Sequence, residues 1–417
     1  MRAIRYMTRE EIPEYVELIA GCYPTMGLVT AEKKANAVTR MLARLDDLPI
    51  ERSYVGVFDG SEMVGGMIVY PFTMNWRGAL VSAGGVGMVA TSLAHRREHV
   101  ARDMIRWFVV EERDRGAVFA LLYPFSTAFY RRMGFGFSSP IMRYELAPGA
   151  LPSTGDRSLC RNLGASDLDA VRQHCHRVTA TQNGMLDKHE SELRAMFESP
   201  SHVVGVQEGT AITGLLRFGF TDGINGNFLS YDLVVNDFSY ETGTALQAML
   251  AYLNSLADQV RRVRIDTQDP EFYHIVDDPR DTSGLLVGDI YHRTNQGGVG
   301  LMVRLTGREI GDEDLASARF GKGTATVSLD IAETLVSETT RRISLCFEDG
   351  RAGRTAPESC CAHVKLGVAD ASSLLTGAVS LRTLADLGRA EVAPPSMLTL
   401  LDGIFKTERP PVCTTAF

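Results

Sequence analysis

The sequence has no long apolar run, few cysteines and a deficit of positive charge. None of its apolar runs is long enough to cross a bilayer, so no membrane-spanning helix is expected. Its first residues, MRAIRYMTREE, contain no apolar segment of the secretory kind, so we expect no signal peptide. Seven cysteines without a tight spacing pattern do not make a disulfide framework. Together these features predict a globular protein of the reducing cytoplasm.

The charge balance further narrows the class of partner. The 417 residues carry a formal net charge of −8, which argues against general nucleic-acid binding and is compatible with cationic substrates. We therefore expect neither nucleic acid nor a membrane as partner. The length predicts two or three domains.

The stretch from residue 84 to residue 138 has the order strand, basic turn, helix, strand, short helix. Val86–Ala90 is an apolar run suited to a buried strand. His95, Arg96 and Arg97 then place positive charge where we expect a helix to begin. A basic turn whose backbone N–H groups open a helix is a site for anions, especially phosphate. This stretch is therefore the first candidate for a binding site.

The helix after the basic turn shows a clear apolar face. Val100, Met104 and Phe108 recur every four residues, and Gly116 is placed to end the helix. The next apolar run, Ala117–Tyr123, predicts another buried strand.

The segments that flank this stretch also give local signals. Thr8 and Glu11 have the spacing of a capping box that opens a helix. Tyr54–Phe58 and Met63–Tyr70 predict two strands joined by an Asp-Gly hairpin turn. Met142–Leu146 predicts a closing strand, and the Pro- and Gly-containing residues after it predict a linker.

The pattern then repeats in the middle of the chain. Val55–Met67 (VGVFDGSEMVGGM) is echoed by Val204–Leu216 (VGVQEGTAITGLL), and Ser166 and Asp169 are spaced for another helix start. An internal duplication explains the echo. The alternative is that two unrelated hairpins share common turn chemistry. The matching helix start favours duplication.

The second copy lacks the basic turn of the first. Asp237 and Glu241 stand where a phosphate would need positive charge. We therefore expect one active site, in the first domain. From about residue 300, short alternating strands, the first at Leu301–Leu305, and short helices predict a small α+β domain. The predicted domains are residues 1–150, 151–298 and 299–417, and the fold class is α/β (α+β) with mixed sheets.

The C-terminal segment allows two interpretations. It has no charged side chain after Arg409, continues with Pro410 and Pro411, and finishes on Phe417. It either lies on the surface without a fixed role, which composition alone favours, or buries its last ring and fixes a carboxylate in place.

These motifs resemble those of a known family. Val86–Phe137 resembles the acetyl-CoA-binding core of the GCN5-related N-acetyltransferases (GNAT). Arg96–Ala101 corresponds to the family pattern Arg/Gln-x-x-Gly-x-Gly/Ala except at His99, and Phe129–Phe137 resembles its Tyr-x-x-x-Gly-Phe element. Over its whole length the chain resembles the enhanced intracellular survival (Eis) acetyltransferases, which have two GNAT-type domains and a sterol-carrier-protein-like (SCP2-like) domain.

The resemblance implies a function and a set of site residues. It implies acetyl-CoA as co-substrate, no metal, a small cationic amine as acceptor (aminoglycoside-, polyamine- or lysine-like) and a homo-oligomer, a hexamer. It implies Tyr130 as the general acid and the carboxylate of Phe417 as the general base. The implied cofactor contacts are Met88, Val89, Ala90, Arg96, Arg97, Glu98, His99, Val100, Ala101, Phe125 and Ser126.

Two questions stay open at the level of sequence. His99 replaces the Gly of the family motif, and its side chain either crowds the pyrophosphate, turns outward or adds a donor. A weakened site would fit a second hypothesis, a homologue that binds an apolar ligand through its sterol-carrier-like domain. Phe72 and Trp76 either line an acceptor pocket or pack within a strand.

Overall fold

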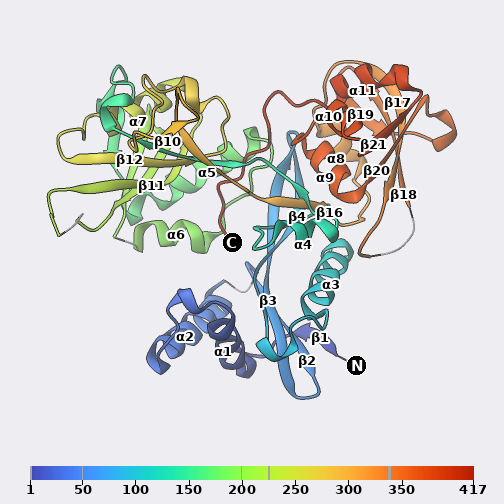
Figure 1. Cartoon of the computed structure of the whole chain (residues 1–417), viewed down its shortest axis with the longest axis horizontal. Coiled ribbons are helices and arrows are strands. Elements are labelled where there is room, and N and C mark those ends of the chain that lie inside the picture. The colour runs from blue at the N-terminus through green and yellow to red at the C-terminus, as the bar shows by residue number, and fades with distance from the viewer. Residues whose placement is uncertain (1, 49, 199, 224–225, 337–339) are drawn as a thin grey trace. The chain divides into compact units, whose positions relative to one another are not determined.

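The computed structural model describes residues 2–48, 50–198, 200–223, 226–336 and 340–417. The chain forms two compact units (Figure 1). The first comprises Met1–Ser138, Leu301–Pro411 and Ala416–Phe417, and the second comprises Ser139–Gly300 and Val412–Thr415. The N-terminal and C-terminal thirds of the chain therefore share one unit, and the first break lies at Ser138 rather than at residue 150.

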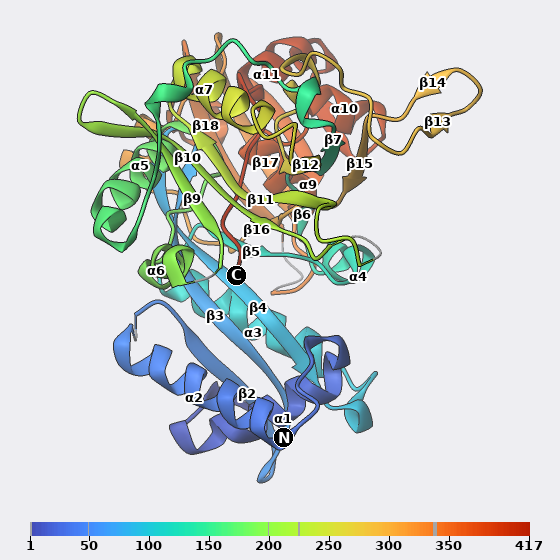
Figure 2. The same cartoon turned by 90° about the vertical axis from the view of Figure 1, so that its left-hand side faces the viewer.

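The first unit is built on a mixed seven-stranded sheet in the order β1-β2-β3-β4-β5-β16-β6. Neighbouring strands are antiparallel except for β4 and β5, which are parallel. The strands are β1 (Ala3–Tyr6), β2 (Ser53–Asp59), β3 (Glu62–Trp76), β4 (Ala79–Thr91), β5 (Phe119–Leu122), β6 (Gly136–Phe137) and β16 (Met302–Leu305). Figure 2 shows the long β3–β4 pair, which carries the site described below.

Helices cover both faces of this sheet. The helices are α1 (Ile12–Cys22), α2 (Ala31–Asp47), α3 (Val100–Asp114) and α4 (Thr127–Arg132). The successive glycines Gly65 and Gly66 point to opposite faces, where Cβ atoms would meet Val100 of α3 and Tyr15 of α1, respectively. The predicted capping box is confirmed, since the Thr8 N–H donates to Glu11 Oε2 at 2.8 Å.

The second unit has a sheet of the same design. Its order is β15-β7-β12-β11-β10-β9-β8, with only β11 and β12 parallel. The strands are β7 (Ile141–Leu146), β8 (Cys160–Asn162), β9 (His202–Glu208), β10 (Ala211–Phe220), β11 (Tyr231–Tyr240), β12 (Val260–Thr267) and β15 (Asn295–Gly298), and β13 (Leu286–Val287) pairs with β14 (Tyr291–His292). Its helices are α5 (Leu168–Thr181), α6 (Glu190–Glu198) and α7 (Gly243–Asn254). Equal strand order in both sheets supports duplication over a chance likeness of two hairpins.

Two strands belong to sheets other than the expected ones. The predicted closing strand forms as β7, but it pairs with β12 and β15 in the second sheet. The first strand predicted for the C-terminal domain forms as β16, which pairs with β5 and β6 in the first sheet. The expected linker is also wrong, because Pro148 and Leu151 are buried, Leu151 in the core of the second unit. The first sheet therefore contains a strand that follows the second repeat in sequence, whereas β7 directly precedes the other strands of the second sheet.

The C-terminal third adds a five-stranded sheet, in the order β19-β18-β17-β20-β21, to the first unit. Its strands are β17 (Thr324–Ala332), β18 (Arg341–Glu348), β19 (Arg351–Arg354), β20 (Ala362–Gly367) and β21 (Ala390–Ala393), and its helices are α8 (Asp312–Ser317), α9 (Val368–Thr376), α10 (Leu381–Asp386) and α11 (Leu398–Phe405). Helix α9 is buried along its whole length and packs against β16 and β6. The C-terminal sheet is thereby joined to the sheet that carries the candidate site.

Candidate functional site

The parallel strands β4 and β5 separate halfway along β4. In the described chain they pair only over Ala83–Gly85 and Phe119–Leu121, while β4 continues to Thr91. The backbone groups of β4 beyond Gly85 thus face a gap on the side of β5. An extended ligand whose hydrogen-bond donors and acceptors alternate can pair with this exposed edge of β4, as an additional strand would.

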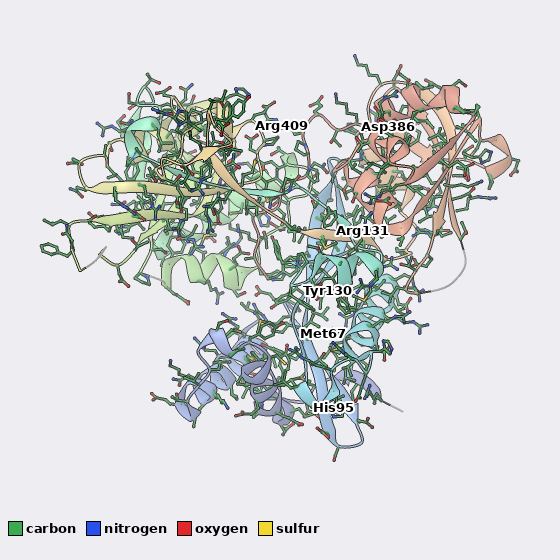
Figure 3. All side chains as sticks on the ribbon, viewed as in Figure 1. Met67, His95, Tyr130, Arg131, Asp386 and Arg409 are labelled. Carbon is green, nitrogen blue, oxygen red and sulfur yellow. The ribbon has the colours of Figure 1, made fainter. Side chains whose placement is uncertain are left out.

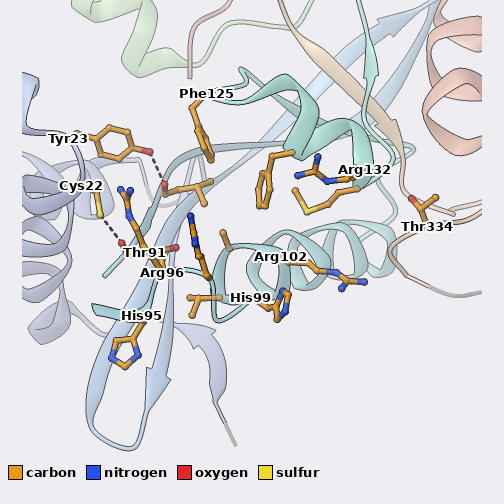
Figure 4. A pocket seen from close by; sticks show the side chains of 16 residues that line it. Cys22, Tyr23, Thr91, His95, Arg96, His99, Arg102, Phe125, Arg132 and Thr334 are labelled. Carbon is orange, nitrogen blue, oxygen red and sulfur yellow. Dashed lines mark hydrogen bonds between the residues drawn. The ribbon is translucent and has the colours of Figure 1, made fainter. Parts of the chain in front are cut away.

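A bulge marks the same part of β4. The register with β3 shifts between Gly66 and Ile68, and Met88 has a positive φ of 50°. The carbonyl groups here are fixed from the side of α1, because the Tyr15 hydroxyl donates to Met88 O and the Tyr23 hydroxyl donates to Val89 O, each at 2.7 Å. Figure 4 shows the second of these bonds. The bulge redirects the strand's backbone groups next to the gap.

The basic turn lies between the end of β4 and α3. The helix begins at Val100 rather than at His95, so the expected position of its start is corrected by five residues. Arg97 and His99 adopt left-handed backbone angles, with φ of 68° and 64°. Glycine favours this conformation, which explains why the family pattern has Gly at the second of these positions. The first N–H groups of α3 have no partner within the helix and are available to an anion.

A cavity of about 900 Å³ lies along this turn (Figure 4). Its lining residues are Cys22, Tyr23, Val89, Thr91, His95, Arg96, Arg97, His99, Val100, Ala101, Arg102, Phe125, Phe129, Arg132, Met133 and Thr334. Four of them are arginines and none is acidic, so the cavity favours an anionic ligand.

The cavity brings together most of the predicted cofactor contacts. Those that line it are Val89, Arg96, Arg97, His99, Val100, Ala101 and Phe125. The others lie next to it: Met88 is in the bulge, Ala90 is buried in β4, Glu98 pairs with Arg2 and His95, and Ser126 precedes α4.

Sequence reasoning missed several lining residues. Cys22 and Tyr23 come from the end of α1, and Thr334 comes from the segment after β17, far away in sequence. No local pattern connects these residues with the basic turn. The sequence did offer a signal for two others, because Arg102 directly follows Arg96–Ala101 and Arg132 lies within Phe129–Phe137.

Tyr130 lies on α4 and is almost fully buried, at 2% exposure (Figure 3). Its ring contacts those of Phe125 and Phe129, with centroids at 5.4 and 5.2 Å. Burial, and secondarily the nearby Tyr23, raise the pKa of Tyr130 well above its ordinary value of 10. Tyr130 therefore holds its proton throughout the physiological range.

The last residue is fixed against β4. The Phe417 ring packs between Phe72 and Tyr123, with centroid distances of 5.0 and 5.3 Å, and also contacts Tyr70. Glycines make room for it, because a Cβ at Gly85 would lie 2.8 Å from the ring, and one at Gly87 would lie 3.2 Å from the Phe417 carbonyl carbon. The final ring is therefore packed against aromatic neighbours but only half-buried, and the role of its carboxylate stays a prediction.

Phe72 and Trp76, both on β3, have different roles. Trp76 is fully buried and donates its Nε1–H to Leu375 O at 2.9 Å, so it packs within the fold. Phe72 contacts Phe417 and belongs to the surroundings of the chain end.

In the second unit, the region that corresponds to the basic turn of the first unit contains ion pairs. Glu241 binds Arg177 and the buried His174, while Asp237 binds Arg217 and Lys188. Burial lowers the pKa of His174. An acidic, internally paired cluster leaves no positive charge for a phosphate, as the sequence predicts.

Two further properties of the described residues concern metal binding and membrane insertion. Among the described residues, no group of three or more His, Cys, Asp or Glu side chains is arranged to hold a metal ion. Within the same part of the chain, no helix has the length and apolar character needed to cross a membrane.

Comparisons with known proteins agree with this geometry. Residues 3–138 and 184–305 match models of the acetyltransferase (GNAT) domain, and residues 313–414 match a sterol carrier protein domain. An uncharacterized N-acetyltransferase of Streptomyces griseus is 24% identical over 373 residues, which are 82% of this chain and 83% of that protein.

Solved structures share the fold over the full length. A GCN5-related N-acetyltransferase from Kribbella flavida has a TM-score of 0.77 at 21% identity, covering 100% of this chain and 98% of its own. Eis1 from Mycobacterium abscessus has a TM-score of 0.75 at 18% identity, with both chains covered completely.

Proposed function

The chain is an acyltransferase with two GNAT domains in the domain organisation of the Eis-like enzymes, and we propose that it transfers the acetyl group of acetyl-CoA to a primary amine. The acceptor we propose is a small cationic amine of the aminoglycoside, polyamine or lysine type, which the net charge of −8 favours. Acetyl-CoA supplies the acyl group as an activated thioester.

The observation that carries this proposal is the opening between β4 and β5, which leads into the arginine-lined cavity. The exposed edge of β4 offers backbone donors and acceptors to the amide groups of the pantetheine chain. The first N–H groups of α3, together with Arg96 and Arg97, suit the pyrophosphate. The residues present therefore fit the cofactor.

We assign the general acid to Tyr130. The hydroxyl is protonated at neutral pH and can donate a proton to the departing thiolate, although burial, which raises its pKa, makes it a weaker acid than a free phenol. Holding the amine and thioester in one place supplies much of the expected rate gain.

We assign the general base to the carboxylate of Phe417. The packing of its ring against Phe72 and Tyr123 fixes the chain end beside Gly87, next to the β4 bulge. A carboxylate held there accepts a proton from the incoming ammonium, directly or through water.

A panel of amines assayed with acetyl-CoA tests the function. We expect saturable binding of acetyl-CoA in calorimetry and release of free thiol with polycationic amines. Tyr130→Phe should lower kcat about 100-fold, with little change in the Kd of acetyl-CoA, because only the proton donor is lost. Four residues appended after Phe417 should lower kcat in the same way. Absence of binding at millimolar acetyl-CoA would refute the function, and an unchanged kcat would refute the corresponding role.

The structure gives less support to the apolar-ligand hypothesis. The space between the C-terminal sheet and its helices is filled by large buried side chains, among them Leu329, Phe347, Leu374, Leu401 and Phe405. We therefore retain catalysis as the proposed function of the chain.

We also propose a homo-oligomer, a hexamer. The hairpin β13–β14 exposes a group of large apolar side chains, Leu285, Leu286, Val287, Ile290 and Tyr291. A contiguous apolar group of this kind is typical of a surface that another chain covers. The mass of the intact chain in solution, measured by light scattering, checks this assembly.

A further inference from the structure

The arginine-lined cavity extends beyond the basic turn. Arg96 and Arg97 lie at the turn itself, whereas Arg102 lies within α3 and Arg132 at the end of α4. In Figure 4, Arg102, Arg132 and Thr334 lie on the side of the cavity away from His95 and Arg96. The cavity therefore has a second basic end that the pyrophosphate turn does not account for.

These two arginines have no acidic partner. Neither Arg102 nor Arg132 makes a hydrogen bond or an ion pair with any residue that the structure describes. Nearby arginines do: Arg131 pairs with Asp370, and Arg113 pairs with Asp114. Two cations that line one cavity without a counter-charge favour an anionic group of the ligand.

A segment from the C-terminal third borders the same end. Glu333 pairs with the fully buried Arg304 and accepts from the N–H groups of Thr334 and Leu335, at 2.8 and 3.1 Å. Leu335 packs into the core beneath α3. A Cβ at Gly134 would lie 3.2 Å from Thr334 Oγ1, so the glycine lets this segment approach α4. The wall at this end is therefore held in place by packing and by a buried ion pair.

Resting on the proposed function, we propose that Arg102 and Arg132 bind the 3′-phosphate of coenzyme A. The pyrophosphate carries two negative charges and a phosphomonoester carries about 1.5 to 2 at pH 7. Two arginines at the turn match the first group, and two at the second end match the other. The site thereby selects coenzyme A over forms that lack the 3′-phosphate.

Calorimetric binding of coenzyme A and dephospho-coenzyme A to the full chain tests this site. We expect the parent to bind dephospho-coenzyme A at least about tenfold more weakly, as for charge-assisted hydrogen bonds to a phosphate. In the double variant Arg102→Gln, Arg132→Gln this ratio should fall close to one. Arg106→Gln is the matched control, because Arg106 is an exposed arginine of α3 that does not line the cavity, and it should keep the parent ratio.

The outcomes separate this proposal from the function on which it rests. If neither compound binds the parent, the proposed function fails. If both bind the parent equally, or if the double variant weakens both by the same factor, the 3′-phosphate site is refuted while cofactor binding stands. Thermal unfolding checks that the variants are folded, and a competition of adenosine 3′,5′-bisphosphate against 5′-ADP should give the same order with the parent.

Discussion

At the scale of single residues, the least expected feature of the site is the conformation of His99. It stands where the motif has Gly, and its backbone is left-handed, with φ of 64° and ψ of 7°. Its side chain is exposed at the edge of the cavity. The chain thus keeps the backbone shape of the motif and accepts the strain of a side chain.

This strain makes His99 a test of the turn. His99→Gly should be more stable than His99→Ala by about 1 kcal/mol, because alanine keeps the left-handed strain that glycine relieves. His99→Gly should also bind acetyl-CoA at least as tightly as the parent. Thermal unfolding and calorimetry measure both effects. Equal or higher stability of the alanine variant would show that the position is not left-handed in solution.

Glu112 is a second unusual residue, buried on α3 at 4% exposure beneath Gly84. Its Oε1 has no hydrogen-bond partner among the described residues, and the nearest cation, Arg115, is 3.8 Å away. Burial raises the pKa of Glu112 to about 7 from an ordinary 4.5, against the lowering effect of Arg115 and with a small contribution from Glu111.

The raised pKa predicts a pH dependence of stability. Between pH 4.5 and 7 the folded state binds the proton more tightly than the unfolded state, so stability falls as pH rises through this window. The loss amounts to about 3 kcal/mol. Glu112→Gln should remove it, giving a variant more stable than the parent at pH 8 but not at pH 4.5. Urea unfolding at both pH values measures this, and an equal difference at the two would contradict it.

At the scale of elements, the β3–β4 hairpin is fastened to the C-terminal third by Arg77 together with the neighbouring Trp76. Arg77, in the hairpin turn, donates to Leu375 O at 2.6 Å and to Phe405 O at 2.5 Å. These carbonyls lie at the C-terminal ends of α9 and α11, where a cation is favoured. Burial lowers the pKa of Arg77 to about 9, which leaves it charged at neutral pH.

Loss of this side chain should be costly. Arg77→Met should destabilise the fold by about 3 kcal/mol, because it removes a buried donor from carbonyl groups at the ends of two helices, of which Leu375 O keeps Trp76 as a donor. Arg351→Met, at an exposed position of β19, is the control and should change stability by less than about 0.5 kcal/mol. Denaturant unfolding of both variants measures the difference. Similar stability of the two would mean that water replaces the lost donor.

At the scale of the whole molecule, the first repeat depends on a strand from beyond the second repeat. The first sheet needs β16, which lies between β5 and β6, and the second sheet needs β7, which lies between β12 and β15. Each unit is thus compact in space but is built from separate segments of the chain.

This arrangement predicts that the first repeat does not fold alone. A fragment of residues 1–150 lacks Met302–Leu305, so β5 and β6 would be left without their common neighbour. We expect the fragment to show no cooperative unfolding and no binding of acetyl-CoA, while the full chain shows both. Circular dichroism and calorimetry compare them. A folded, binding-competent fragment would show that β16 is dispensable.

The sequence by itself determined most local features. The capping box before α1, the Asp-Gly hairpin turn, the basic turn, the apolar face of α3 and the acidic replacement of the turn in the second repeat could all be predicted. Each depends on residues within one or two turns of each other, where periodicity and turn chemistry act directly. The duplication could be predicted for the same reason, because the two copies keep the same spacing of residues along the chain.

Only the tertiary structure decided which sheet receives β7 and β16, which side chains complete the cavity, and where Phe417 lies. Thr334, Arg304 and Phe417 reach the site from more than 150 residues beyond the basic turn, and no local periodicity records such contacts. The physical reason is that burial of apolar surface and pairing of strand edges are satisfied by any partner of suitable shape, so the partner is chosen only when the whole chain packs.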